Sequence, residues 1–276
     1  MRSILLLAFL CTSMSISMTA QSIYYNYEQD NVVRLELNRP IFKDAFAGDA
    51  INFFSFDAYL NGEFKIGESN KIAFELPFSR ISVGSESESN FGNISVAYQL
   101  RNLSSPSYFE FKLRIPSAGD DSFSFITTDY TERFSANFPV WSLEPSFLYE
   151  SGFGNGGYFR VKPGAKLLFD DDDNIDDDIE VLFDLSGVIG YRNGSIDING
   201  GFTSTTVLTE DAGAFSDRSL WQAFATVTYN ANQFQPGLIF RLPINSIFQD
   251  IYSITIGVQL GYRFGGSSVE VPTDEN

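Results

Sequence analysis

The sequence predicts an all-β protein: an antiparallel up-and-down transmembrane β-barrel of about 12 strands. Three observations lead to this fold class. The 276 residues are rich in Phe (28), Tyr (13) and Gly (22), a composition typical of strands and tight turns. Apolar residues recur with a period of two in many segments. The connections between these segments alternate between short turns and longer, acidic loops.

Charge and composition exclude several classes of function. The formal net charge is −17, from 18 basic and 35 acidic residues, and nucleic-acid binding needs the opposite sign. The sequence contains no His, the usual general base and the commonest metal ligand. We therefore expect no enzyme of the Ser–His or Asp–His type, no catalytic residues and no cofactor. Outside the N-terminus no apolar run approaches the roughly 18 residues of a helical membrane span.

The first 20 residues have the pattern of an export signal. Arg2 supplies the positive charge, Ile4–Leu10 is a short apolar core, and Ala20 precedes a plausible cleavage point before Gln21. An anchor helix is the weaker interpretation because the apolar run spans only seven residues. Cys11 is the only cysteine and lies in this segment, so the mature chain has no thiol. We expect residues 1–20 to be a signal peptide and the protein to reach the bacterial outer membrane.

The strand assignments rest on the period-two pattern, which is clearest at the C-terminal end. From Ile254 to Phe264 six apolar residues alternate with polar or small ones. The predicted barrel, residues 21–264, contains twelve such segments: Val32–Asn38, Ile51–Ile66, Ile72–Phe78, Ile94–Leu100, Phe109–Ile115, Val140–Glu150, Tyr158–Phe169, Ile179–Arg192, Ser195–Thr209, Trp221–Tyr229, Phe234–Leu242 and Ile254–Phe264.

The connections alternate in length, as in outer-membrane barrels with short periplasmic turns and longer outer loops. The five short ones are Gly67–Asn70, Asn102–Ser107, Ser151–Gly157, Asn193–Gly194 and Asn230–Gln233. The six longer ones are Arg39–Asp49, Val83–Asn90, Pro116–Phe134, Asp170–Asp178, Glu210–Ser219 and Pro243–Asp250. Strand boundaries inferred from a pattern shift by a few residues, so ten or fourteen strands stay open.

The faces opposite the apolar ones would line the lumen, and they are densely charged. This alternation assigns twelve basic and ten acidic residues to the interior, and such a balance lets buried charges pair. The lumen-lining candidates are Glu110, Lys112, Arg114, Glu144, Arg160, Lys162, Glu180, Asp184, Arg241 and Arg263, together with Arg34, Lys65, Lys71, Arg101, Lys166, Arg192, Glu36, Asp57, Glu63, Glu75, Glu150 and Asp197. In a soluble secreted sandwich, the alternative fold, the same charges would face solvent.

The last strand resembles the C-terminal assembly signal of Gram-negative outer-membrane barrels. Tyr262 and Phe264 match the aromatic positions of that signal, and residues 265–276 would form a short periplasmic tail. The resemblance implies recognition by the barrel-assembly machinery and insertion among outer-membrane lipid and lipopolysaccharide.

Residues 60–120 resemble a second group, outer-membrane proteins assigned to transport in the phenol meta-pathway. Leu76–Pro77, Gly92–Asn93, Pro116–Ser117 and Gly119–Asp120 carry this resemblance. It implies a channel or transporter for small, often hydrophobic, solutes. The alternative is a non-transporting structural or adhesive barrel with acidic surface loops.

The acidic segment from Asp170 to Asp178 is the one metal-site candidate. Clustered carboxylates suit Ca²⁺ or Mg²⁺, but the spacing does not match an EF-hand loop. Two other interpretations compete with a metal site. The segment could be a solvated, self-repelling outer loop, or an outer loop that joins the cation lattice of lipopolysaccharide. The acidic residues are Asp170, Asp171, Asp172, Asp173, Asp176, Asp177 and Asp178.

Overall fold

The computed structural model of the chain describes residues 31–43, 55–83, 86–101, 107–117, 128–136, 140–169, 179–209, 218–230 and 233–265. The predicted signal peptide, the tail from residue 266 onward and the acidic segment 170–178 lie outside the described residues.

Strands make up most of the described chain. They are β1 (Asn31–Phe42), β2 (Phe56–Lys65), β3 (Asn70–Val83), β4 (Glu86–Phe91), β5 (Ile94–Arg101), β6 (Tyr108–Ile115), β7 (Trp141–Phe153), β8 (Gly157–Phe169), β9 (Ile179–Asn193), β10 (Ile196–Val207), β11 (Ser219–Tyr229), β12 (Phe234–Pro243) and β13 (Tyr252–Phe264). A 3-10 helix, η3 (Phe134–Ala136), precedes β7, and one α-helix, α3 (Ser246–Ile251), precedes β13.

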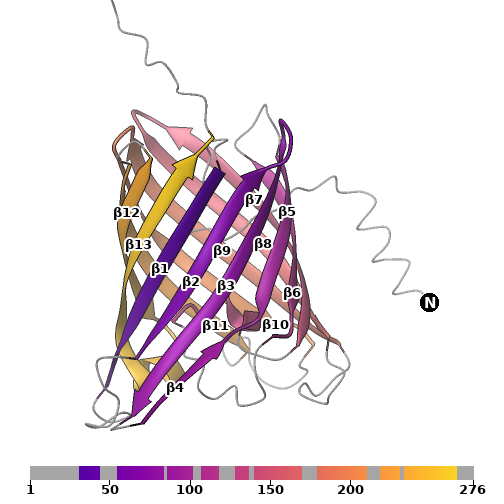
Figure 1. The fold of residues 1–276 in the computed structure, drawn as a ribbon, viewed down its shortest axis with the longest axis vertical. Helices are drawn as coiled ribbons and strands as arrows, with labels where there is room; N and C mark the ends of the chain where they lie inside the picture. Colours follow the sequence, from indigo (N-terminus) through magenta and orange to yellow (C-terminus); the bar gives the residue numbers. More distant parts are fainter. Residues whose placement is uncertain are drawn as a thin grey trace, which may run out of the picture.

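Twelve of these strands close into a barrel, which confirms the predicted fold class (Figure 1). Each pairs antiparallel with its neighbours, and β13 pairs with β1 along its whole length, from Asn31 opposite Phe264 to Phe42 opposite Tyr252. Closure leaves none of the twelve ring strands at an unpaired edge, which is the condition for crossing a bilayer with strands. All twelve predicted segments correspond to strands of the ring.

The two faces of the wall differ in chemistry as the alternation predicts. On β1, Leu35 and Leu37 are exposed on the outside while Glu36 and Asn38 are fully buried inside. The same outward apolar face recurs around the ring, at Ile72, Val96, Phe111, Leu113, Leu143, Phe159, Val161, Ile198, Val227, Leu238, Ile256, Val258 and Leu260. Such a face is stable against lipid, so the barrel is of the membrane-spanning type. None of the described helices has the length and hydropathy to cross a membrane.

The two ends of the barrel are named here by their connections. The turn end holds the β2–β3, β5–β6, β7–β8, β9–β10 and β11–β12 connections, the start of β1 and the end of β13. The loop end holds the others. At the turn end the β9–β10 hairpin has the two-residue loop Gly194–Ser195, one residue later than predicted, since Asn193 pairs with Ile196. The Asn193 side chain explains the shift, because its Oδ1 accepts from the amides of Ser195 (3.3 Å) and Ile196 (3.0 Å).

Three predicted loops contain elements that the period-two pattern did not indicate. The predicted loop Val83–Asn90 is largely the additional strand β4, which pairs with the loop-end half of β3. Helix α3 occupies the loop Pro243–Asp250, and η3 begins at the end of the loop Pro116–Phe134. Strand β4 escaped prediction because its sequence, Glu-Ser-Glu-Ser-Asn-Phe, has no apolar alternation. It is positioned by cross-strand contact instead, with the rings of Phe78 and Phe91 5.4 Å apart.

Candidate functional site

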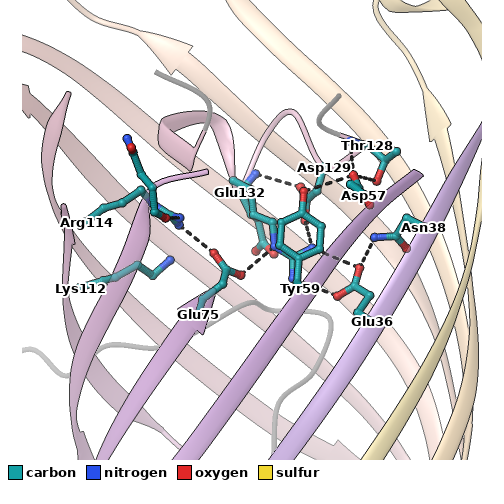
Figure 2. Close-up of polar contacts among 12 residues, drawn as sticks. Glu36, Asn38, Asp57, Tyr59, Glu75, Lys112, Arg114, Thr128, Asp129 and Glu132 are labelled. Atoms are coloured by element: carbon teal, nitrogen blue, oxygen red, sulfur yellow. Dashed lines mark hydrogen bonds and ion pairs between the residues drawn. The ribbon is translucent and has the colours of Figure 1, made fainter. Parts of the chain in front are cut away.

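Residues Thr128–Ala136, called here the inward segment, fold into the loop-end half of the lumen. They belong to the connection from β6 to β7, predicted to be an outer loop as far as Phe134, and that prediction is wrong for 128–134 (Figure 2). Their first residue, Thr128, is bound by wall side chains of two strands. Asp57 Oδ2 accepts from the amide (2.8 Å) and hydroxyl (2.6 Å) of Thr128, and Gln222 Nε2 donates to its carbonyl (2.7 Å). Thr128 is therefore held between β2 and β11.

Arg133 is the centre of the inward segment. Its Nη1 and Nη2 donate to the two carboxylate oxygens of Glu36 on β1, at 3.1 and 2.9 Å, and its Nε donates to Glu75 on β3 at 2.8 Å. Its guanidinium also lies 3.4 Å from the ring centroid of Tyr59 on β2. The planar guanidinium can bind two carboxylates and stack on an aromatic ring at the same time. Lysine carries the same charge but lacks this planar, multidentate geometry.

Two further arginines extend this network into the wall. Arg241 on β12 donates to Glu36 (2.9 Å) and to Asn38 Oδ1 (3.0 Å). Arg114 on β6 bridges Glu75 (3.1 Å) and Glu144 (3.3 Å). All three arginines are almost completely buried, and each charge is matched by carboxylates. An arrangement of this kind is costly to break, because a buried charge would then lack a partner.

The opposite wall holds the middle of the inward segment. Lys166 Nζ on β8 and Thr205 Oγ1 on β10 donate to the Thr131 carbonyl, at 2.7 and 2.9 Å. The hydroxyls of Thr131 and Thr203 lie 2.6 Å apart. Glu132 is bridged to Lys162 on β8 at 3.5 Å. The segment thus contacts strands on all sides of the ring.

An aromatic contact covers the inward segment at the loop end. The ring of Tyr130 stacks on Phe248 of α3, with centroids 3.8 Å apart and planes 4° apart. The Tyr130 hydroxyl donates to the carbonyl of Trp221. Burial raises the pKa of the Tyr130 hydroxyl, so it stays protonated and keeps this hydrogen bond.

Asn93 fixes the C-terminal end of the inward segment. Its amide donates to the Ala136 carbonyl (2.9 Å), and its side-chain Nδ2 donates to the carbonyls of Ser135 (3.1 Å) and Val140 (3.3 Å). Its Oδ1 accepts from the amide of Ser117 (2.9 Å). Asn93 lies in the break between β4 and β5, where one extra residue interrupts pairing with β3. This bulge turns a strand residue toward the segment.

The motif residues of the second resemblance contact one another around Asn93, at the break between β4 and β5. Gly92 donates its amide to the carbonyl of Pro77 (3.1 Å) and accepts from the Ser117 hydroxyl (3.0 Å). Asn93 is bound to Ser117 as described. The Leu-Pro, Gly-Asn and Pro-Ser pairs are therefore architectural: they form the junction to which the inward segment is attached. The pair Gly119–Asp120 lies outside the described residues.

The structure places most of the predicted lumen-lining residues in the interior. Glu110, Lys112, Arg114, Glu144, Arg160, Lys162 and Arg241 are buried. Asp184 is bridged to Lys166 at 2.8 Å. Glu180 and Arg263 lie near the loop end of β9 and the turn end of β13 and are partly exposed. The aromatic residues of the predicted assembly signal lie at the turn end, where Tyr262 contacts Phe234 and Phe264 contacts Phe64.

A second polar cluster lies at the turn end, away from the inward segment. Arg160 on β8 donates twice to Glu150 on β7, at 3.1 and 2.9 Å. Arg192 on β9 joins Glu150 (3.2 Å) to Asp197 (2.7 Å), and Tyr158 donates to Asp197 (2.7 Å). This cluster binds neighbouring strands to one another and contacts no described residue of the inward segment.

Sequence reasoning missed the charged residues of the inward segment itself: Asp129, Glu132 and Arg133. They follow no period-two pattern, and charged residues in a long connection are ordinarily solvated. No group of three or more acidic, Cys or His side chains that could hold a metal ion occurs among the described residues.

Comparison with known proteins supports the fold and does not assign a family. No family model matches the chain, and no curated protein matches it. Among solved structures, the chain is similar to the COG4313 outer membrane channel from Pseudomonas putida F1 (13% identity, 89% of this chain and 100% of that one, TM-score 0.57). It is also similar to the NanC porin (8%, 86% and 100%, 0.52) and to LpxR from Salmonella typhimurium (8%, 84% and 100%, 0.50).

These likenesses establish an outer-membrane β-barrel fold, in agreement with the predicted location in the bacterial outer membrane. At such low identity a shared fold says nothing about solute or reaction.

Proposed function

We propose that the protein is a channel through which small polar solutes cross the outer membrane. The observation that carries this proposal is the charged interior: the described lumen is lined by ionisable side chains on β1–β3, β6–β10 and β12. Apolar side chains would fill a barrel of this size at least as stably, so the charges point to a task other than packing. Ionised walls suit solutes that keep part of their water.

The likeness to proteins described as an outer membrane channel and a porin supports the same proposal. The resemblance of residues 60–120 implied solutes that are often hydrophobic. The charges of the described lumen favour polar solutes instead, because an apolar compound would gain little by displacing water from ion pairs.

In this proposal the inward segment controls passage. Its residues contact β1, β2 and β3 on one side and β8, β10 and β11 on the other. In this proposal a solute passes when part of the segment moves, and the described bonds that hold the segment are non-covalent.

A disulfide that fixes the segment tests this. Thr131 and Thr203 are suitable positions because their Oγ1 atoms lie 2.6 Å apart, close to the separation of two bonded sulfurs. The variant is Thr131→Cys with Thr203→Cys, made with Cys11→Ser so that no other thiol is present.

The measurements are conductance in planar bilayers and solute entry into liposomes. We expect the unmodified protein to conduct, the oxidised double variant to conduct less, and reduction to restore passage. The single variant Thr203→Cys serves as the control, since it forms no intramolecular crosslink. An unmodified barrel that neither conducts nor admits small sugars would refute the proposal.

A structural barrel without transport is the second candidate. The observation in its favour is the extent of the buried ion-pair network, which ties the inward segment to most of the ring. A deletion strain that loses resistance to detergents while solute uptake is unchanged would favour this candidate.

A further inference from the structure

Glu110 on β6 is a buried carboxylate with an incomplete set of partners. It is fully buried, and its Oε2 accepts one hydrogen bond, from Nε2 of Gln99 on β5, at 3.0 Å. Its Oε1 is buried without any donor, and so is Oε1 of Gln99. An ionised oxygen left without a donor in a buried site is costly, so such an atom points to an occupant that the protein itself does not supply.

Asp57, Asp129 and Glu132 also have one buried carboxylate oxygen without a donor. Glu110 differs from the other buried acidic side chains of the described lumen because it has no cationic partner and only one hydrogen-bond donor. Those with a Lys or Arg nitrogen within 4.0 Å are Glu36, Glu63, Glu75, Asp129, Glu132, Glu144, Glu150, Asp184 and Asp197. Asp57 has no such partner, but its Oδ2 accepts from the Thr128 amide and hydroxyl and from the Tyr59 hydroxyl. Glu110 has only a neutral amide.

The basic side chains near Glu110 form ion pairs with other carboxylates. Lys112 on β6 is bridged to Glu144 at 3.1 Å, and Lys162 on β8 to Glu132 at 3.5 Å. Lys71, which lies opposite Gln99 on β3, is bridged to Glu63 at 3.2 Å. The two residues paired directly with Glu110 are uncharged: Gln99 on β5 and Ser146 on β7.

The charge balance of the described ion pairs around the inward segment agrees with this. The residues that hold the inward segment comprise six basic side chains, Lys112, Arg114, Arg133, Lys162, Lys166 and Arg241, and seven acidic ones, Glu36, Asp57, Glu75, Asp129, Glu132, Glu144 and Asp184. Glu110 adds a further negative charge beside an already negative group. A bound cation would offset it.

We propose that Glu110 and Gln99 form a binding subsite for monovalent cations and for the ammonium group of cationic solutes. The subsite lies on the turn side of the inward segment, since Glu110 is the third residue of β6 from the turn end. One carboxylate oxygen and one amide oxygen suit a cation that keeps part of its water. Tight divalent binding takes more acidic ligands than this subsite offers. The subsite deepens the proposed function by naming cations as favoured solutes, but binding can be tested without transport.

Binding is measured on the full chain in detergent by sodium-23 NMR at mildly alkaline pH, with methylammonium as competitor. We expect line broadening that methylammonium reverses, and about tenfold weaker sodium binding in Glu110→Gln, because the variant keeps the shape and loses the charge. Glu150→Gln is the matched control. It removes the same charge from a carboxylate already bridged to Arg160 and Arg192, so we expect sodium binding to persist. Absence of binding in the unmodified protein, or equal loss in both variants, overturns the subsite.

Transport is measured separately, as the reversal potential of reconstituted protein in a potassium chloride gradient. We expect the unmodified channel to prefer potassium over chloride, and Glu110→Gln to lose more of this preference than Glu150→Gln. A conducting channel whose preference and sodium binding are both unchanged in Glu110→Gln refutes the subsite and leaves the proposed function standing. A barrel that binds sodium through Glu110 but never conducts refutes the proposed function and leaves the subsite standing.

Discussion

Replacing Arg133 by Met tests whether the inward segment is held in the lumen by its charge network. The substitution removes three hydrogen bonds to Glu36 and Glu75 and the contact with the Tyr59 ring. Breaking a buried ion pair on one side costs about 3–5 kcal/mol. Glu36 keeps Arg241 and Glu75 keeps Arg114, so we expect the lower end, about 3 kcal/mol. At about 1.4 kcal/mol per tenfold, the undocked fraction should rise about a hundredfold.

The readout is the rate at which a thiol in the segment reacts with a membrane-impermeant maleimide. Ala136 is a suitable position because it is fully buried when the segment is docked. In an Ala136→Cys, Cys11→Ser background the labelling rate is proportional to the undocked fraction. We expect Arg133→Met to raise this rate about a hundredfold and Arg133→Lys to raise it less, since lysine keeps the charge but not the bidentate geometry.

Arg160→Met is the control for a general effect of removing a buried arginine. Arg160 is equally buried and bonds Glu150 through Nε and Nη2, but it contacts no described residue of the inward segment. The reasoning would be refuted by a labelling rate that stays within about threefold of the parent, well below the change expected from a buried ion pair. It would also be refuted by an equal rise in both variants.

Three further predictions concern the wall, the junction and assembly. Gly201→Ala should lower by several degrees the temperature at which the barrel unfolds, measured as the loss of the folded band on a gel of samples heated in detergent, because the added Cβ would lie 2.0 Å from the Gly187 carbonyl oxygen. Gly67→Ala, whose Cβ would have no atom within 4 Å, should leave this temperature unchanged. Asn93→Ala should increase thiol labelling of the segment by tenfold or more, about 1.4 kcal/mol or greater, since it removes two donated side-chain bonds and one accepted bond. Phe264→Ala should reduce the amount of folded barrel in the outer-membrane fraction without changing total synthesis; equal amounts would argue against the predicted assembly signal.

The sequence by itself predicted about twelve ring strands, their approximate ends, the alternation of turns and loops, and which face of each strand is charged. The physical reason is that a bilayer imposes a local rule. Every second residue must be apolar whatever its neighbours are, and every strand must be long enough to cross. The run from Ile254 to Phe264 satisfies that rule without reference to any other part of the chain.

Only the tertiary structure decided which charges meet. Arg133 pairs with Glu36 across 97 positions of sequence, and Arg241 reaches the same carboxylate across 205. Barrel closure creates the second pair, because β13 pairs with β1 and β12 pairs with β13. The first pair forms because the inward segment folds into the lumen and meets β1. A charged residue in a long loop has the same local pattern whether it is solvated or folded inward, so Arg133 could not be identified from its neighbours.

The same limit explains the role of Asn93 and the isolation of Glu110. In sequence, Gly92–Asn93 was one of the pairs that carry the second resemblance. In the structure, Asn93 binds the carbonyl of Ser135 in the inward segment, 42 positions away, and that of Val140 just after the segment, 47 positions away. Glu110 could be placed in the lumen by alternation alone. Its lack of a cationic partner follows from Lys112 pairing with Glu144 and Lys162 pairing with Glu132. These pairings depend on distances across the closed lumen, which the sequence does not give.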